Sequence, residues 1–247
     1  MRTVLLGLLL ILSGCATIPQ GQRHPADPWE GYNRAIFKFN DKLDQIVLKP
    51  VAKGYQKVTP DIVETGVSNF FSNLFDVGVS LNNLLQGKPR RAGSDLMRFV
   101  MNSTFGIAGL FDVASSAGLE KHNEDFGQTL ATWGVPSGPY FMLPFLGPST
   151  IRDTGALSVD YYTRYPWVFL EDDTARTGLT VLNFIDTRSQ LLRIQEILGS
   201  DFYDPYASIR SAWLNRREAL IADGVVESSG NEDDELIKEL EAMDADI

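Results

Sequence analysis

Residues able to support nucleophilic, acid–base or metal chemistry are scarce in this chain of 247 residues, which contains one cysteine and two histidines. Segment 134–138 (GVPSG) places Ser137 one position too late for the Gly-x-Ser-x-Gly turn of serine hydrolases. A lipase built on Ser137 would need a base, and His122 is the one structured candidate. His122 itself stands in an acidic segment, 120–125, that suits either a metal ion or a charged surface turn. We therefore predict no catalytic residue and no metal site, and we keep a lipase as an alternative.

The single cysteine, Cys15, lies in a segment that indicates covalent lipid attachment. Residues 1–14 combine Arg2 with a short apolar run and small residues, which is typical of a secretory signal, and the run is too short to cross a bilayer. Segment 12–15 (LSGC) is similar to a bacterial lipobox, in which the cysteine is lipidated and becomes the mature N-terminus. We predict a lipoprotein signal peptide at 1–14, then a lipidated Cys15 and tether at 15–26. The covalent lipid on Cys15 is the only cofactor expected.

The charge of the chain is concentrated at its C-terminal end. The formal net charge is −10, and nine acids against one lysine lie in residues 227–247, so the remainder is almost neutral. An acidic chain does not suit nucleic acid as a partner. Because the end of the chain lacks aromatic residues, we predict an acidic disordered tail at 223–247.

Apolar residues recur at helical spacing along most of the remaining chain. Those in segment 29–46 follow at intervals of three and four, which predicts a helix that ends before Pro50. A wide apolar arc predicts a second helix at 60–85, with a bend at Gly78. Patterns typical of strands are almost absent. The fold class is therefore all-α, with a helical domain at 27–222.

One long segment, 126–151, contains no Asp, Glu, Lys, Arg or His. Its prolines and glycines exclude a membrane-spanning helix over that length. The run Tyr140 to Leu143 is apolar and is flanked by Gly138-Pro139 and Pro144, which predicts two bends and a hairpin-like loop. A loop of this kind either packs in a protein core or lines a path in a membrane protein, and the sequence leaves both alternatives open.

The apolar arcs of several predicted helices are wider than the stripe that a surface helix needs. Segment 62–85 has twelve large apolar residues but only two charges, Glu64 and Asp76. A plain helical core could bury part of this surface. We favour amphipathic helices embedded in one leaflet of a membrane, because a lipid anchor is predicted beside them.

Several short motifs occur in a fixed order along the chain. They are DPWEGYNR (27–34), NFFSNL (69–74), LLQGK (84–88), GIAGLFDVA (106–114), EDFGQTL (124–130), GPY (138–140), LPF (143–145), RD (152–153), DTR (186–188) with LL (191–192), and DPY (204–206). Together, and behind a lipobox, they closely resemble the MlaA (VacJ) family of outer-membrane lipoproteins. The resemblance covers about residues 27–222, and the tail beyond it matches no motif.

The resemblance implies a ring-shaped helical protein, lipid-anchored in the periplasmic leaflet of the outer membrane. It implies a non-enzymatic function, in which mislocalised phospholipids are removed from the outer leaflet and passed to a soluble periplasmic lipid carrier, which maintains the lipid asymmetry of the membrane. Trimeric porins are the further partner that it implies. No Walker-type phosphate loop is present, which fits a passive conduit. A structural lipoprotein that binds porin without transport is the main alternative.

Two segments are the predicted lipid path and gate. In the first helix, one stripe is formed at intervals of four, three and four by Asn33, Phe37, Asn40 and Asp44, with Phe39 beside it. A mixed stripe suits contact with both tails and headgroup, and a solvated helix flank is the alternative. In the loop, Tyr140, Phe141, Met142 and Leu143 are the predicted pore-lining or moving residues, and a static core loop is the alternative.

Overall fold

The computed structural model describes residues 24–198 and 203–223. The predicted signal peptide, the lipidated Cys15 and most of the tether lie outside the described residues. So does the predicted acidic tail, apart from Asp223. The description below concerns the helical domain between them.

The first helix does not end before Pro50, as the sequence had indicated. Helix α2 (Glu30–Leu43) continues through a π-helical segment, Asp44–Leu48, into helix α3 (Lys49–Val58). Pro50 lies in the first turn of α3, directly after the π segment, where the Lys49 N–H donates to the Asp44 carbonyl five residues earlier and the proline itself has no N–H to donate. In the π segment the hydrogen-bond spacing changes from four residues to five, and this local change lets the helix continue past the proline.

The remaining helices follow the predicted order. Their bounds are α4 Asp61–Leu85, α5 Pro89–Thr104, α6 Val113–Ser116, α7 Phe126–Thr132, α8 Ile151–Arg164, a 3₁₀ turn at Pro166–Phe169, α9 Asp173–Leu198 and α10 Pro205–Ile221. Aspartate side chains cap the N-termini of several of these helices. Asp172 Oδ1 accepts hydrogen bonds from the N–H groups of residues 174 and 175, and Asp204 caps α10 in the same way.

Helix α4 is continuous across Gly78, so the glycine does not end the helix. It allows close packing instead. A Cβ at residue 78 would lie 2.9 Å from Arg164 Cγ and 3.0 Å from the Thr163 carbonyl oxygen. Glycine therefore brings α4 against the end of α8.

The Gly/Pro-rich loop forms a small antiparallel hairpin, as predicted. Strand β1 (Tyr140–Leu143) pairs with β2 (Gly147–Thr150), and Leu143 lies opposite Gly147 next to the turn. The turn requires left-handed backbone at Phe145 and Gly147, with φ of 66° and 89°. The all-α fold class with one hairpin-like loop is confirmed.

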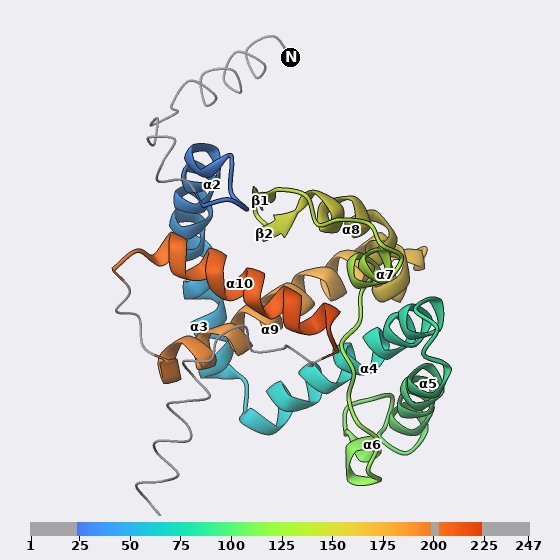
Figure 1. Ribbon diagram of the computed structural model, residues 1–247. Coiled ribbons are helices and arrows are strands. Elements are labelled where there is room, and N and C mark those ends of the chain that lie inside the picture. Colours follow the sequence, from blue (N-terminus) through green and yellow to red (C-terminus); the bar gives the residue numbers. More distant parts are fainter. Residues whose placement is uncertain (1–23, 199–202, 224–247) are drawn as a thin grey trace, which may run out of the picture.

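The elements form a closed ring, which Figure 1 shows. Helix α2 lies against β1, and β2 leads into and contacts α8. Helix α8 contacts α4, α4 contacts α9, and α9 packs on α3, which is continuous with α2. Helix α10 lies across this ring and contacts α7 and β2.

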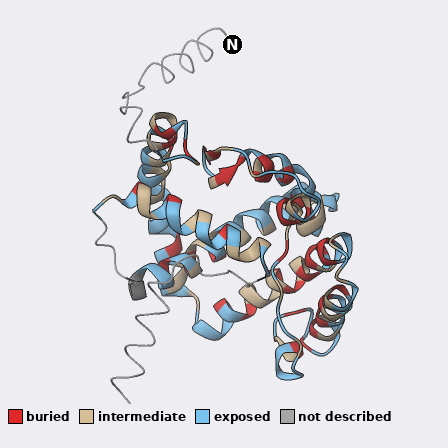
Figure 2. Cartoon of the chain, viewed as in Figure 1, coloured by how far each residue is buried: buried red, intermediate tan, exposed pale blue. Residues whose placement is uncertain are grey.

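Burial in this ring is the reverse of that in a water-soluble helical protein. The buried positions of α4 include Glu64, Asn73, Asp76, Asn82 and Asn83, whereas its exposed positions are mostly large and apolar. The buried positions of α5 are similarly polar, and Figure 2 shows buried and exposed positions alternating along both helices. Among the described residues no helix combines the length and apolar character needed to span a membrane. The burial pattern makes α4 and α5 amphipathic, with the polar side turned inward.

This inverted pattern leads to a prediction about two adjacent residues of α4. Leu84 is 58% exposed, so we expect Leu84→Ser to change the free energy of unfolding in detergent by less than about 0.5 kcal/mol. Asn83 is fully buried and donates a 2.7 Å hydrogen bond to Asp95 Oδ2. Asn83→Leu should therefore cost about 1–3 kcal/mol, because a buried carboxylate loses a donor. Urea unfolding followed by circular dichroism would measure both, and equal costs would contradict the inverted arrangement.

Candidate functional site

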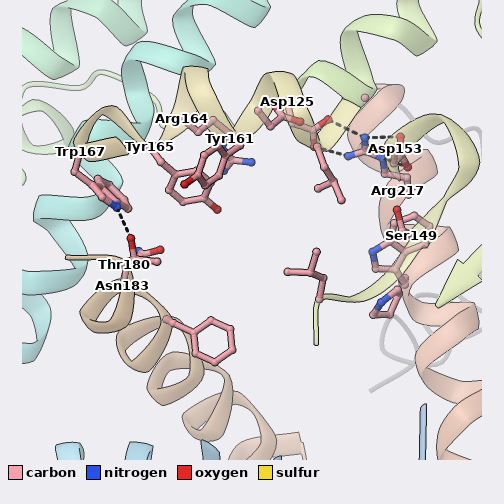
Figure 3. Close-up of a pocket in the computed structure, with 17 residues that line it drawn as sticks. Asp125, Ser149, Asp153, Tyr161, Arg164, Tyr165, Trp167, Thr180, Asn183 and Arg217 are labelled. Carbon is pink, nitrogen blue, oxygen red and sulfur yellow. Dashed lines mark hydrogen bonds and ion pairs between the residues drawn. The ribbon is translucent and has the colours of Figure 1, made fainter. Parts of the chain in front are cut away.

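A cavity of about 440 Å³ opens where the hairpin, α7, α8, α9 and α10 meet, and Figure 3 shows its lining. The lining residues are Asp125, Gly127, Leu146, Pro148, Ser149, Asp153, Leu157, Asp160, Tyr161, Arg164, Tyr165, Trp167, Thr180, Asn183, Phe184, Trp213 and Arg217. Charged groups and apolar side chains both face this space. Its volume is within the usual range for small-molecule sites.

One wall of the cavity is built around Arg217 of α10. Its guanidinium donates paired hydrogen bonds to Asp125, at 2.5 and 2.7 Å, and a second pair to Asp153, at 3.0 and 2.9 Å. Burial alone would raise the pKa of Asp125, but the hydrogen bonds from Arg217 lower it to about 2. These bonds join the start of α7, the start of α8 and α10 into one rigid corner.

The same corner requires Gly127. A Cβ at this position would lie 2.3 Å from Arg217 Nη2 and 2.5 Å from Asp153 Oδ1. The glycine therefore leaves room for the ion pairs to pass close to the α7 backbone. This explains why a glycine stands in the second position of a short helix, where it lowers helix propensity.

Two further charged groups face the cavity on α8. Asp160 accepts a 2.9 Å hydrogen bond from the Phe126 N–H, and burial raises the pKa of its carboxyl group to about 6. The guanidinium of Arg164 lies over the Phe75 ring, 5.3 Å from its centroid. Among the described residues neither Asp160 nor Arg164 forms an ion pair, with each other or with another side chain.

The hairpin supplies another wall. Leu146, Pro148 and Ser149, from the turn and β2, are lining residues, and Leu157, Phe184 and Trp213 add apolar surface. Trp167 donates a 3.1 Å hydrogen bond to Thr180 at the opposite side, as Figure 3 shows. The cavity thus offers separate polar and apolar surfaces to one occupant.

Two predicted residues of α2 hold the hairpin in place. Asn33 donates to the Tyr140 carbonyl at 3.2 Å and accepts from the Met142 N–H at 2.8 Å. Two helical turns later, Asn40 donates to the Leu143 carbonyl at 2.9 Å and accepts from the Phe145 N–H at 2.9 Å. The two amides therefore satisfy the free edge of β1, as a neighbouring strand would.

The other predicted lipid-path residues lie around this contact. Tyr140 and Met142 are buried in a small apolar cluster, and Phe141 stacks on Tyr32 with ring centroids 5.2 Å apart. Phe37 contacts Tyr206, and Phe39 meets Phe145 of the turn, with centroids 5.7 and 5.3 Å apart. The structure thus brings the two predicted segments together. None of the eight predicted residues is among those that line the cavity, and their lipid-path role stays a prediction.

The α2 end of the ring is closed by a buried network between the first and last motifs. Asp27 accepts hydrogen bonds from Asn33, Tyr206 and Arg210. Arg34 forms a bidentate pair with Asp204, at 3.1 and 2.7 Å. These contacts fix α2, and hence the hairpin, against α10.

The residues considered for catalysis are not brought together. His122 Nδ1 lies 2.7 Å from Asp95 Oδ1 of α5. The Ser137 carbonyl accepts from the Arg152 N–H, and within residues 24–198 and 203–223 no hydrogen bond joins Ser137 to His122. The arrangement that a lipase would need is therefore not present between these two side chains.

Sequence reasoning missed the cavity residues Arg217, Asp153, Asp160 and Arg164. For Arg217 and Asp153 the sequence contained a signal. Asp153 and its neighbour in space, Asp125, lie in two of the ordered motifs, and two buried carboxylates require a cation such as Arg217. For Asp160 and Arg164 the sequence gives only a spacing of four on a predicted helix. That spacing places them on one face without indicating what the face meets.

The fold and the cavity define a class of protein. The apolar exterior of the helical ring is suited to an apolar medium. Its polar interior and amphipathic cavity are suited to a path for polar groups. This is a membrane-associated helical protein.

Comparisons with known proteins agree, and they identify the family. The family model for the MlaA lipoprotein matches residues 25–220, so the chain belongs to the MlaA lipoprotein family. It is 34% identical to the Escherichia coli K12 protein named intermembrane phospholipid transport system lipoprotein MlaA, over 93% of this chain and 92% of that protein. The Haemophilus influenzae protein of the same name is 33% identical, over 97% and 99% of the two chains.

A solved structure gives the same result. It concerns the structural basis for maintenance of bacterial outer membrane lipid asymmetry, and it superposes with a TM-score of 0.68 at 36% identity, over 79% of this chain and 98% of that one. The resemblance drawn from the motifs is therefore confirmed.

The raised pKa of Asp160 predicts a pH-dependent stability effect. An ionised carboxylate whose folded pKa is about 6 instead of 3.8 destabilises the fold above pH 6, and this effect disappears as the pH falls towards 3.8. Asp125 raises this pKa, while Arg164 and Arg217 lower it. Asp160→Asn can still accept from the Phe126 N–H. It should increase the free energy of unfolding at pH 7.5 by about 1–2 kcal/mol, allowing for solvent screening in the cavity.

The measurement is urea unfolding of both proteins at pH 7.5 and pH 4.5. The difference between them should shrink at the lower pH, where wild-type Asp160 is protonated. A variant that is less stable than wild type at pH 7.5 would contradict the assignment.

Proposed function

We propose that this chain is an outer-membrane lipoprotein that moves phospholipids out of the outer leaflet and passes them to a soluble periplasmic carrier. The observation that carries the proposal is the amphipathic cavity inside a ring whose outer surface is apolar. The relatives named above are phospholipid transport lipoproteins, and the chain spans nearly their whole length.

The physical requirement of such transport is large. A phospholipid with two long acyl chains of about 16 carbons each would expose roughly 25 kcal/mol of apolar surface to water, at about 0.8 kcal/mol per CH₂ group. Its headgroup would be equally unfavourable in hydrocarbon. A path with both kinds of lining lowers both barriers, and the cavity between the hairpin, α8 and α10 has such a lining.

The finer parts of the proposal concern placement and partners. Lipidation of Cys15 anchors the chain in the periplasmic leaflet, and the exposed apolar residues of α4 and α5 lie within that leaflet. Trimeric porins and the periplasmic carrier are the protein partners. The chain acts as a passive conduit without a catalytic step.

A cavity-filling substitution tests the proposal. Leu157 lines the cavity on α8, so Leu157→Trp should obstruct it. Outer-leaflet phospholipid should then accumulate to the level found in cells without the gene. Val159, two residues along α8, does not line the cavity and is exposed, which makes Val159→Trp the matched control.

Envelope levels and helical circular dichroism of both variants must equal those of wild type. If Leu157→Trp cells keep a normal outer leaflet, the cavity is not the lipid path. If cells without the gene also keep a normal outer leaflet, the structural porin-binding alternative is favoured over transport.

The hydrogen bonds between α2 and the hairpin lead to a second prediction, for a deletion in α2. Deleting Phe39 and Asn40 removes the Asn40 bonds to the turn, and it rotates all later α2 residues by about 200° relative to those before them. We expect misregulated lipid flow, seen as a leaky membrane sensitive to detergent, and not a simple loss of transport. Lys42→Ala, at an exposed position of α2, is the control. A folded deletion variant with normal transport would remove α2 as a gate.

A further inference from the structure

Two opposite charges face the cavity from one side of α8. Asp160 and Arg164 are four residues apart, so they lie one turn from each other, with Cβ atoms about 5–6 Å apart. Oppositely charged residues at this spacing usually pair. Here they do not, and within the described part of the chain neither finds another ion-pair partner.

The position of Arg164 is fixed although its guanidinium forms no ion pair with any residue that the structure describes. Its stem packs where Gly78 lets α4 approach, and its guanidinium lies over Phe75. Its Nε is buried and has no hydrogen-bond partner among the described residues. A held, unsatisfied guanidinium in a cavity is suited to binding an anion, and phosphate groups match its planar set of donors.

Asp160 offers the complementary charge. One carboxylate oxygen accepts from the Phe126 N–H, and the other makes no hydrogen bond within residues 24–198 and 203–223. The other charged residues of the cavity are already engaged, because Arg217 pairs with both Asp125 and Asp153. Among the described residues that line the cavity, Arg164 and Asp160 are therefore a cation and an anion without ion-pair partners, one turn apart on α8.

We propose that Asp160 and Arg164 together bind the zwitterionic headgroup of a phospholipid. Arg164 binds the phosphate, and Asp160 binds the ammonium of an ethanolamine-type headgroup. The two-carbon link between phosphate and ammonium spaces its charges by about one helical turn. The inference rests on the proposed function, and it adds a headgroup class and the two residues that select it.

The rest of the cavity suits this orientation. Thr180 and Asn183 are neutral polar groups that also line the cavity, and Figure 3 shows them beside Trp167, whose indole N–H donates to Thr180. Leu157 and Phe184 give apolar surface for the first part of the acyl chains. An anionic headgroup without an ammonium would satisfy Arg164 but would leave Asp160 unpaired, and carboxylate and lipid would repel each other.

The test is a binding titration of the full-length protein in non-ionic detergent. The probes are short-chain dihexanoyl phosphatidylethanolamine and dihexanoyl phosphatidylglycerol, followed by the fluorescence of Trp167 and Trp213 in the cavity wall. Arg164→Gln should weaken binding of both lipids by about tenfold or more, because the phosphate loses a charged donor. Asp160→Asn should weaken phosphatidylethanolamine alone by about tenfold and leave phosphatidylglycerol unchanged or tighter.

Two exposed residues of α10 outside the cavity provide matched controls, Arg216→Gln and Glu218→Gln, and both should leave the affinities unchanged. If Arg164→Gln loses its helical circular dichroism, Arg164→Lys replaces it in the test, because lysine keeps the charge and most of the stem. Arg164→Lys should weaken binding of the two lipids equally, because an ammonium group lacks the planar set of donors that matches phosphate. Inorganic phosphate alone, at the same concentrations, should not compete with phosphatidylethanolamine.

The outcomes separate the two proposals. The headgroup assignment alone would be overturned if neither Arg164→Gln nor Asp160→Asn changed lipid binding. It would also be overturned if Asp160→Asn weakened the binding of both lipids equally. Effective competition by inorganic phosphate would also overturn it, because the site would then be a free-phosphate site. A wild-type protein that binds neither lipid would overturn both this assignment and the proposed function.

Discussion

The pairing of buried charges and polar groups governs this fold. In most helical proteins apolar packing decides how helices meet, but here the apolar side chains of α4 and α5 face outward and polar side chains face each other. A buried carboxylate or guanidinium is tolerated only with hydrogen-bonded partners, because desolvation of an isolated charge is very unfavourable. The helices must therefore meet where their charges match. Arg217, held between Asp125 and Asp153, is the clearest case.

The same constraint explains the order of contacts around the ring. Arg98 of α5 is buried and bonds to Asp112, and Arg188 of α9 forms a bidentate pair with Asp44 in the π segment. The Arg188–Asp44 pair joins elements that are distant in sequence, whereas the Arg98–Asp112 pair joins α5 to the start of the neighbouring α6. Directional ion pairs and hydrogen bonds specify one geometry, whereas apolar contacts tolerate sliding. A ring assembled in this way can keep its shape in an apolar medium, in which the hydrophobic effect does not hold helices together.

On one wall of the cavity this pairing is left incomplete. Arg217 is saturated, while Asp160 and Arg164 on the facing wall are not. Proteins retain such unfavourable groups at sites of function, where a ligand supplies the missing partner. The hairpin that closes the cavity is held by two asparagine amides through exchangeable hydrogen bonds, and its turn has left-handed backbone at Phe145.

Much of this protein was determined by its sequence alone. Helical periodicity, the capping aspartates and the Gly/Pro punctuation fixed an all-α chain with one hairpin, since these are local effects. The ordered motifs identified the family. Local rules failed at Pro50, because a π-helical segment absorbed the proline without ending the helix. The sequence also placed Asn33 and Asn40 on one stripe of α2.

Only the tertiary structure decided what each stripe meets. It gave Asn33 and Asn40 the edge of β1, and placed Tyr140 and Met142 in a core instead of in the cavity lining. It also left Asp160 and Arg164 unpaired. A spacing of four residues predicts that two charges share a face, but whether they pair depends on groups brought from distant helices. Contacts across the ring therefore set the chemistry of the cavity, and no local pattern encodes them.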